Sequence, residues 1–206
     1  MPPHYTKMPL DAPRSILTQV LRMCYTCAMK SYDKLYDDAA DNYGIITSAK
    51  ARSLGISNMA LVQLARRGRL IHIRRGIYRL AHYVPTEYDD YAQAVASAGD
   101  SAYLYGESVI ALLNLVPTNP TRIYVAVKGR SRKKLQTGIF LKSAPLDYVP
   151  TPIQGIPCQR VGDAIRSAAD TVSRDRLSDA ALEAYRTGVL SKKEAEEIVR
   201  DMKATP

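Results

Sequence analysis

The stretch that decides the fold is Thr47–Leu80, TSAKARSLGISNMALVQLARRGRLIHIRRGIYRL. Thr47 or Ser48 can cap a short helix, because a hydroxyl oxygen accepts hydrogen bonds from the free N–H groups of a first turn. Gly55 ends that helix, since glycine adopts the left-handed backbone conformation at little steric cost. Ser57 then caps a second helix. Two short helices joined by a tight glycine-bearing turn predict a helix-turn-helix.

A β-hairpin is predicted directly behind the second helix. Residues 70–73 and 77–80 are rich in β-branched and aromatic side chains, and Arg74-Arg75-Gly76 separates them. Glycine at a tight turn between two such runs indicates a hairpin. A hairpin in this place is the wing of a winged helix. Upstream, we expect residues 31–42 to form the first helix and residues 44–46 to pair with the wing.

The charge of this stretch favours a polyanionic partner. Residues 44–80 contain eight basic residues and no acidic one. Arginines at a helix end and at a hairpin tip suit the phosphate backbone of a nucleic acid. The alternatives are a solvated basic surface without a ligand, and a helix-turn-helix that docks another protein. Because pattern, hairpin and charge agree, we interpret residues 31–81 as a DNA-binding domain.

We expect the second helix to enter the major groove, where amide side chains can make paired hydrogen bonds to adenine. The helix-leading residues that would meet base edges are Ser57, Asn58, Met59 and Gln63. Phosphates would be held by Lys50, Arg66 and Arg67. The wing arginines Arg74 and Arg75 would reach the adjacent backbone or the minor groove.

These residues also carry a resemblance to a known family. "GIITSAKARSLGIS", "LARRGRLIHI" and "RRGIYRL" resemble the N-terminal winged helix of AbiEi-family antitoxins of type IV toxin-antitoxin and abortive-infection systems. The later "YLYGESVIALLNLVP" and "GIPCQRVGDAIRSAAD" are similar to further parts of that family, so the resemblance covers about residues 32–170. It implies an antitoxin that represses its own operon and counteracts a nucleotidyltransferase-type toxin.

The rest of the chain predicts an α+β fold. We expect a leader at residues 1–30, the winged helix at 31–81, and at 82–206 a mixed α+β domain with a small antiparallel sheet and C-terminal helices. In that sheet the alternating strand 122–127 would pair antiparallel with residues 139–142. Thr86 with Asp89 predicts a helix start over 86–98, and apolar spacing turns Leu182 and Tyr185 inward.

A second basic segment lies between the two strands of this predicted pair. Residues 108–146 hold seven basic residues and no acidic one, while the remaining chain has 14 basic and 20 acidic residues. The loop residues Lys128, Arg130, Arg132, Lys133 and Lys134 repel one another and cannot pack together. They form either a second phosphate contact, on DNA or RNA, or a solvated hairpin tip.

No residue pattern predicts catalysis, a metal or a cofactor. Cys24 and Cys27 form a lone CxxC without a second pair or a neighbouring histidine, and Cys158 has the character of a small buried hydrophobe. We therefore expect a protein that is not an enzyme, with no catalytic residues, no metal and no cofactor. The few cysteines and the absence of a long apolar run predict a cytoplasmic protein away from membranes.

The residues predict a DNA-binding protein, and the resemblance implies that it is an antitoxin with double-stranded DNA of its own promoter as partner. A cognate toxin would be a further partner, directly or indirectly. The alternatives are a winged-helix module that docks a protein partner such as the toxin, and an ordinary transcriptional regulator.

Overall fold

The structure is a computed structural model that describes residues 32–118, 121–129 and 135–204. The expected leader, with Cys24 and Cys27, lies outside the described residues. The same holds for four members of the second basic segment, Arg130, Arg132, Lys133 and Lys134.

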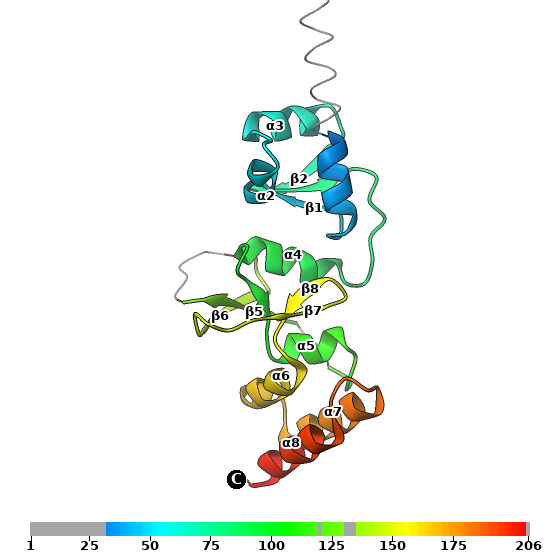
Figure 1. Ribbon diagram of the computed structural model, residues 1–206, viewed down its shortest axis with the longest axis vertical. Coiled ribbons are helices and arrows are strands. Elements are labelled where there is room, and N and C mark those ends of the chain that lie inside the picture. Colours follow the sequence, from blue (N-terminus) through cyan, green and yellow to red (C-terminus); the bar gives the residue numbers. More distant parts are fainter. Residues whose placement is uncertain (1–31, 119–120, 130–134, 205–206) are drawn as a thin grey trace, which may run out of the picture.

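The N-terminal part has the predicted order of elements (Figure 1). A helix over residues 32–40 is followed by β1 (Ile45–Thr47), α2 (Ser48–Ser53), α3 (Asn58–Arg66), β2 (Leu70–Arg74) and β3 (Ile77–Leu80). β3 pairs antiparallel with both β1 and β2, which gives a three-stranded sheet in the order β1-β3-β2. This is a helix-turn-helix with a hairpin behind it and a short strand paired to the hairpin.

The helix ends follow from local sequence. Thr47 Oγ1 accepts a hydrogen bond from Lys50 N at 3.1 Å, and Ser57 Oγ accepts one from Ala60 N at 3.2 Å. These hydroxyls satisfy N–H groups that a helix leaves unpaired at its start. Gly55 has a φ of 76°, a conformation that costs other residues energy, so the chain can turn sharply between α2 and α3.

The winged helix has its own hydrophobic core. Leu35 and Ala39 of the first helix are buried, whereas Tyr36 is 50% exposed. The helix-turn-helix and one face of the sheet contribute the other core residues. These are Ile46, Ala51, Ile56, Leu61, Leu64, Leu70, Tyr78 and Leu80.

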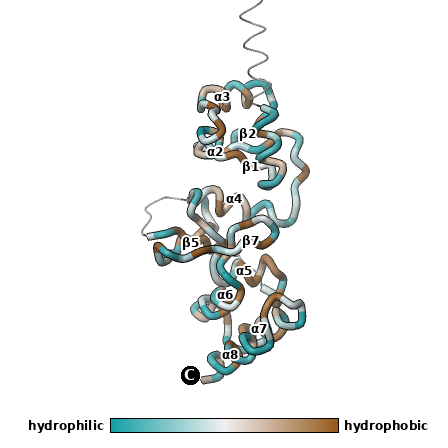
Figure 2. Tube along the Cα trace, in the orientation of Figure 1, coloured by the Kyte–Doolittle hydropathy of each residue, from teal (hydrophilic) through white to brown (hydrophobic). Residues whose placement is uncertain are grey.

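The second part is a mixed α+β arrangement with helices at its C-terminal end. Its elements are α4 (Asp89–Ala98), β4 (Tyr103–Leu104), α5 (Glu107–Leu112), β5 (Ile123–Lys128), β6 (Ile139–Ala144), β7 (Thr151–Ile153), β8 (Ile156–Cys158), α6 (Val161–Ser167), the short 3₁₀ helix η1 (Ala168–Asp170), α7 (Arg174–Arg186) and α8 (Lys192–Ala204). The strands form a five-stranded sheet in the order β6-β5-β4-β8-β7. In Figure 2, β5 is largely hydrophobic and α8 largely hydrophilic, which matches their places in the core and at the end of the molecule.

The direction of β6 contradicts the prediction. β6 runs parallel to β5, with Ile123 opposite Ile139 and Lys128 opposite Ala144. The sheet is therefore mixed, because β4 pairs antiparallel with β5 but parallel with β8. β5 and β6 therefore do not form a hairpin. Alternation of side chains could not reveal this, since it is the same for both strand directions.

Of the two last helices, α8 buries the expected residues Ala195, Ile198 and Met202, whereas α7 buries a face that differs in part from the one expected. α7 turns Leu177, Ala180, Ala181 and Ala184 into the core, whereas Leu182 is 40% and Tyr185 is 44% exposed. Our assignment of Leu182 and Tyr185 to the inner face was wrong. Small alanine side chains let α7 and α8 approach closely. The face of α7 that carries the alanines is therefore buried, and the face that carries the larger side chains is exposed.

Cys158 lies at the centre of the second core and is fully buried, as predicted. Burial raises the pKa of its thiol to about 12. Because the folded pKa lies above that of an exposed thiol, this burial stabilises the protein below about pH 9, and the contribution is lost as the pH rises towards 12.

We expect a Cys24→Ser/Cys27→Ser variant, in which Cys158 is the remaining thiol, to resist alkylation in its native state and to react fully in urea. Rapid alkylation of the folded variant at pH 8 would contradict the burial.

The two parts meet through the other face of the small sheet. Ile45 and Ile77 point away from the winged-helix core and belong to the second core, together with Ala92 and Val95 of α4. α4 therefore packs beneath β1, as Figure 1 shows. One side of the wing is an internal contact, and α3 lies at the far end of the molecule.

Candidate nucleic-acid interface

The best candidate surface is the outer face of α3. Ser57, Asn58, Met59, Gln63 and Arg66 are all exposed, as is Arg67 directly after the helix. Leu61 and Leu64 hold the opposite face of α3 in the winged-helix core. All six predicted contact residues of this helix are thus brought together on one accessible surface.

The prediction missed Val62, which is 37% exposed between Met59 and Arg66. Residues three and four apart share a helix face, so its spacing from Met59 and Arg66 was the signal that could have found it. Met59 itself is 68% exposed. The surface therefore offers apolar side chains as well as amides, and apolar groups can contact the methyl group of thymine.

Arg66 and Arg67 are the free charges of this surface. Neither makes an ion pair with any residue that the structure describes. Their neighbour Arg69 instead lies over the ring of Tyr32, with its guanidinium carbon 5.3 Å from the ring centre. Two unpaired guanidinium groups at the end of α3 can form bidentate contacts to phosphate.

The two wing arginines have different environments. Arg75 is exposed at the hairpin tip, whereas Arg74 is half-buried and its Nη1 is buried without a hydrogen-bond partner among the described residues. Both line a cleft of about 580 Å³ between the hairpin, the start of α2 and the end of α4, which also contains Ser97, Asp100 and Leu135. The expectation that Arg74 reaches out from the tip is therefore corrected, because its side chain is half-buried in this cleft.

Lys50 lies apart from the α3 surface. Its ammonium is 2.9 Å from Asp38 of the first helix, and this hydrogen-bonded carboxylate raises the pKa of Lys50. The pair lines a separate cavity of about 200 Å³ between the winged helix and α4. We no longer assign Lys50 to a phosphate, since its charge is compensated on the side that faces the second domain.

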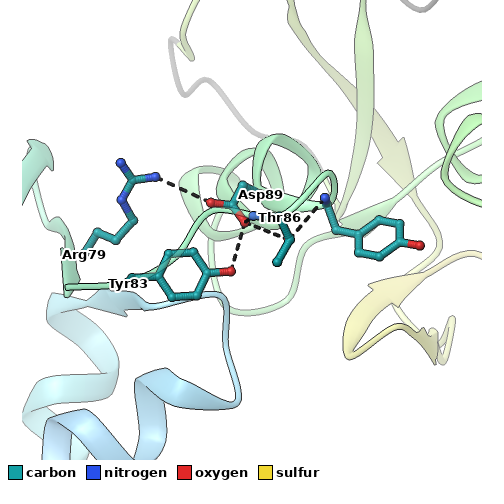
Figure 3. A network of polar contacts seen from close by, with 5 residues as sticks. Arg79, Tyr83, Thr86 and Asp89 are labelled. Atoms are coloured by element: carbon teal, nitrogen blue, oxygen red, sulfur yellow. Dashed lines mark hydrogen bonds and ion pairs between the residues drawn. The ribbon is translucent and has the colours of Figure 1, made fainter. Parts of the chain in front are cut away.

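Asp89 joins the wing, the linker and α4 in one polar network (Figure 3). Its Oδ1 accepts hydrogen bonds from Tyr83 Oη at 2.9 Å, Thr86 N at 3.0 Å and Thr86 Oγ1 at 2.9 Å. Arg79 of β3 lies 3.5 Å from Oδ2 and completes the network as an ion pair. Asp89 thus accepts from Thr86 N as predicted, but the predicted helix start at Thr86 was wrong, because α4 begins at Asp89 with Tyr88 as its N-cap residue.

We expect Asp89→Ala to lower the free energy of unfolding by about 1–3 kcal/mol, because three hydrogen bonds from Tyr83 and Thr86 to a charged carboxylate would be lost. Asp89→Asn should cost less, since the amide oxygen can still accept. Asp90→Ala is the control, because Asp90 is exposed in the same helical turn. Urea denaturation measures all three, and equal effects of the two alanine variants would contradict this role of Asp89.

Lys128 is exposed at the end of β5. It is the one residue of the predicted second phosphate contact that the structure describes. No group of acidic, histidine and cysteine side chains suited to hold a metal ion occurs within residues 32–118, 121–129 and 135–204. In the same part of the chain, no helix is both long and apolar enough to cross a bilayer.

The fold and this surface define a winged-helix type of protein with an additional α+β part. Residues 34–81 match the family described as "Transcriptional regulator, AbiEi antitoxin". This match confirms the resemblance seen in the sequence for residues 34–81.

Comparison with solved structures shows a more distant likeness. The chain is similar to the "Crystal structure of RV2827C protein from Mycobacterium tuberculosis", with 14% sequence identity over 84% of this chain and 80% of that chain and a TM-score of 0.37. A likeness this distant carries no functional argument. No curated protein matches the chain.

Proposed function

We propose that this protein is a DNA-binding transcriptional regulator that binds double-stranded DNA of its own promoter through α3. The observation that carries the proposal is the exposed face of α3, which ends in two arginines without an ion pair among the described residues. The N-terminal residues of a recognition helix contact base edges in helix-turn-helix proteins. Asn58 and Gln63 are then the residues that read sequence, and Arg66 and Arg67 hold the backbone.

The experiment is a mobility-shift titration of the full chain with DNA from upstream of its own gene, over a series of salt concentrations. A regulator of this kind binds its site more tightly than scrambled DNA, and its affinity falls steeply with salt. Equal affinity for both DNAs, or no dependence on salt, would overturn the proposal. It would favour the alternative of a winged helix that docks a protein.

The environments of the wing arginines predict a matched pair of effects. We expect Arg75→Gln to weaken DNA binding several-fold for all sequences and to reduce the salt slope by about one, as the loss of one phosphate contact does. Arg74→Gln makes the same charge change next to it but should leave DNA affinity nearly unchanged, because Arg74 is half-buried in the cleft beside α4. The opposite order of the two variants would show that the hairpin tip is placed differently on DNA.

Gln63→Ala should act differently from both wing variants. An amide that reads a base contributes to sequence preference more than to overall affinity. We expect the variant to lose discrimination between the promoter and a scrambled site while its salt slope stays the same. Selection of binding sites from a random DNA pool measures this preference.

The antitoxin role is the second half of the proposal. The family that residues 34–81 match supports it. In this role the protein represses an operon that also encodes a nucleotidyltransferase-type toxin, and it relieves the effect of that toxin. Co-expression with the neighbouring gene tests it: growth arrest by that gene alone and rescue by this protein are expected. A neighbour without toxicity would leave an ordinary transcriptional regulator.

A further inference from the structure

One face of the five-stranded sheet carries a row of aromatic rings. Tyr105 follows β4, and its N–H donates to the carbonyl oxygen of Tyr124 at 2.9 Å. Tyr124 in turn lies opposite Phe140 of β6, with ring centres 5.8 Å apart. Because alternate residues of a strand point to the same face, these three rings line the side of the sheet away from α4. The neighbouring residues Ile123, Val125 and Leu141 point into the core instead.

Cations accompany this row. The guanidinium carbon of Arg122 lies 4.8 Å from the ring centre of Phe140, and Lys142 Nζ lies 6.0 Å from that of Tyr124. Lys128, two positions beyond Ala126, points to the same face. Neither β5 nor β6 contains an acidic residue. This face is therefore basic as well as aromatic, whereas the α3 surface is basic but has no aromatic side chain.

Another part of the same face already binds a planar ring, which belongs to the protein itself. Tyr148 stacks on Tyr103 with ring centres 5.0 Å apart and planes at 19°. Its hydroxyl donates to Asp163 at 3.0 Å and accepts from Arg160 N at 2.9 Å, which fixes the ring in place. That part of the face is closed by the protein's own aromatic side chain. The adjacent part is open, since Phe140 is 38% exposed and Tyr124 is half-buried.

The chemistry of this open part selects a ligand with planar groups and negative charges. A duplex hides the faces of its bases, so only an unpaired strand can stack its bases on protein rings. Cations at exposed aromatic rings are weakly held, at about 0.5–1 kcal/mol, so they can shift to a phosphate when a base takes their place. β6 is an edge strand, so a chain can lie along the open side of the sheet. In a cell, unpaired strands are mainly RNA.

We propose that the face formed by Tyr105, Tyr124, Phe140, Arg122 and Lys142 is a second nucleic-acid site that binds single-stranded RNA by stacking. Bases stack on Tyr124 and Phe140, and Arg122 and Lys142 hold the phosphates between them. This site is separate from the duplex site on α3, so each can be tested without the other.

The chain has no Trp, which allows a direct test with the full-length protein. Phe140→Trp places a single indole on the face, and Met59→Trp places one on α3. We expect unlabelled single-stranded RNA of about ten nucleotides, within the range of single-strand site sizes, to quench the indole at position 140 and not the one at position 59. No quenching at position 140, or equal quenching at both positions, would overturn the proposal.

Affinities measured by fluorescence anisotropy with a labelled RNA complete the test. Phe140→Ala should weaken RNA binding about tenfold, as the loss of one stacked base does, and Phe140→Tyr should retain it. Arg122→Gln with Lys142→Gln should flatten the salt dependence. Tighter binding of single-stranded DNA than of RNA, or unchanged affinity of Phe140→Ala, contradicts the proposal. Duplex DNA should bind Phe140→Ala as it binds the unaltered protein, so failure here leaves the function of α3 untouched.

Discussion

Replacing both Arg66 and Arg67 by glutamine is expected to weaken binding to duplex DNA roughly 10- to 100-fold at physiological salt. The two guanidinium groups are exposed at the end of α3 and make no ion pair with the described residues, so their full charge is available to phosphates. Each phosphate contact that is lost reduces the slope of log K against log salt by about one. We therefore expect the slope to fall by about two.

The matched control is the double variant Arg176→Gln and Arg200→Gln, which removes the same charge from exposed positions of α7 and α8. A field effect of total charge would weaken binding equally in both double variants, whereas a local contact affects only α3. Mobility shifts over a salt series measure both quantities. If the control lost as much affinity as the α3 variant, duplex DNA would not be held at α3.

Replacing Leu61 by alanine is expected to lower the stability of the winged helix by about 2–5 kcal/mol. Leu61 is fully buried and fixes α3 to the first helix and the sheet. Removing its side chain leaves a cavity, and the surrounding side chains can collapse into it only in part. Because α3 then loses its support, DNA binding should fail at temperatures where the second core is still folded.

Leu177→Ala provides the comparison, since Leu177 of α7 is equally buried but belongs to the second core. We expect this variant to be destabilised by a similar amount and to retain DNA affinity while it is folded. Thermal unfolding followed by circular dichroism, with DNA binding measured at each temperature, separates the two variants. Identical loss of DNA binding in both would mean that the two cores unfold as one unit.

Local chemistry explains how much of the winged helix could be predicted. A hydroxyl at a helix start, a glycine at its end and apolar residues at helical spacing act over a few residues, so Thr47, Gly55, Ser57 and Leu61 have the predicted places. The hairpin of the small sheet could be predicted in the same way, because Gly76 lies between two segments rich in residues that favour strands. The part of the chain that matches the AbiEi antitoxin family, residues 34–81, is this same winged helix.

The net charge of the same stretch was a less reliable guide. Residues 44–80 contain no acid, yet the fold brings Asp38 to Lys50 and Asp89 to Arg79. Both carboxylates lie outside the stretch in sequence. Ion pairing depends on distance in space, so it could not be seen in a local count of charges. Of the phosphate contacts predicted in the winged helix, Arg66, Arg67 and Arg75 are exposed and make no ion pair with the described residues.

The sequence by itself determined the helix-turn-helix, the hairpin and the outward face of α3, because each depends on hydrogen bonds and side-chain spacing within a few residues. Only the tertiary structure decided that β6 runs parallel to β5, that Arg74 is half-buried in a cleft beside α4, and that α4 packs under the small sheet. These three features arise from contacts between different elements of the fold. Their free energy depends on which surfaces meet, and a local pattern of residues carries no record of that.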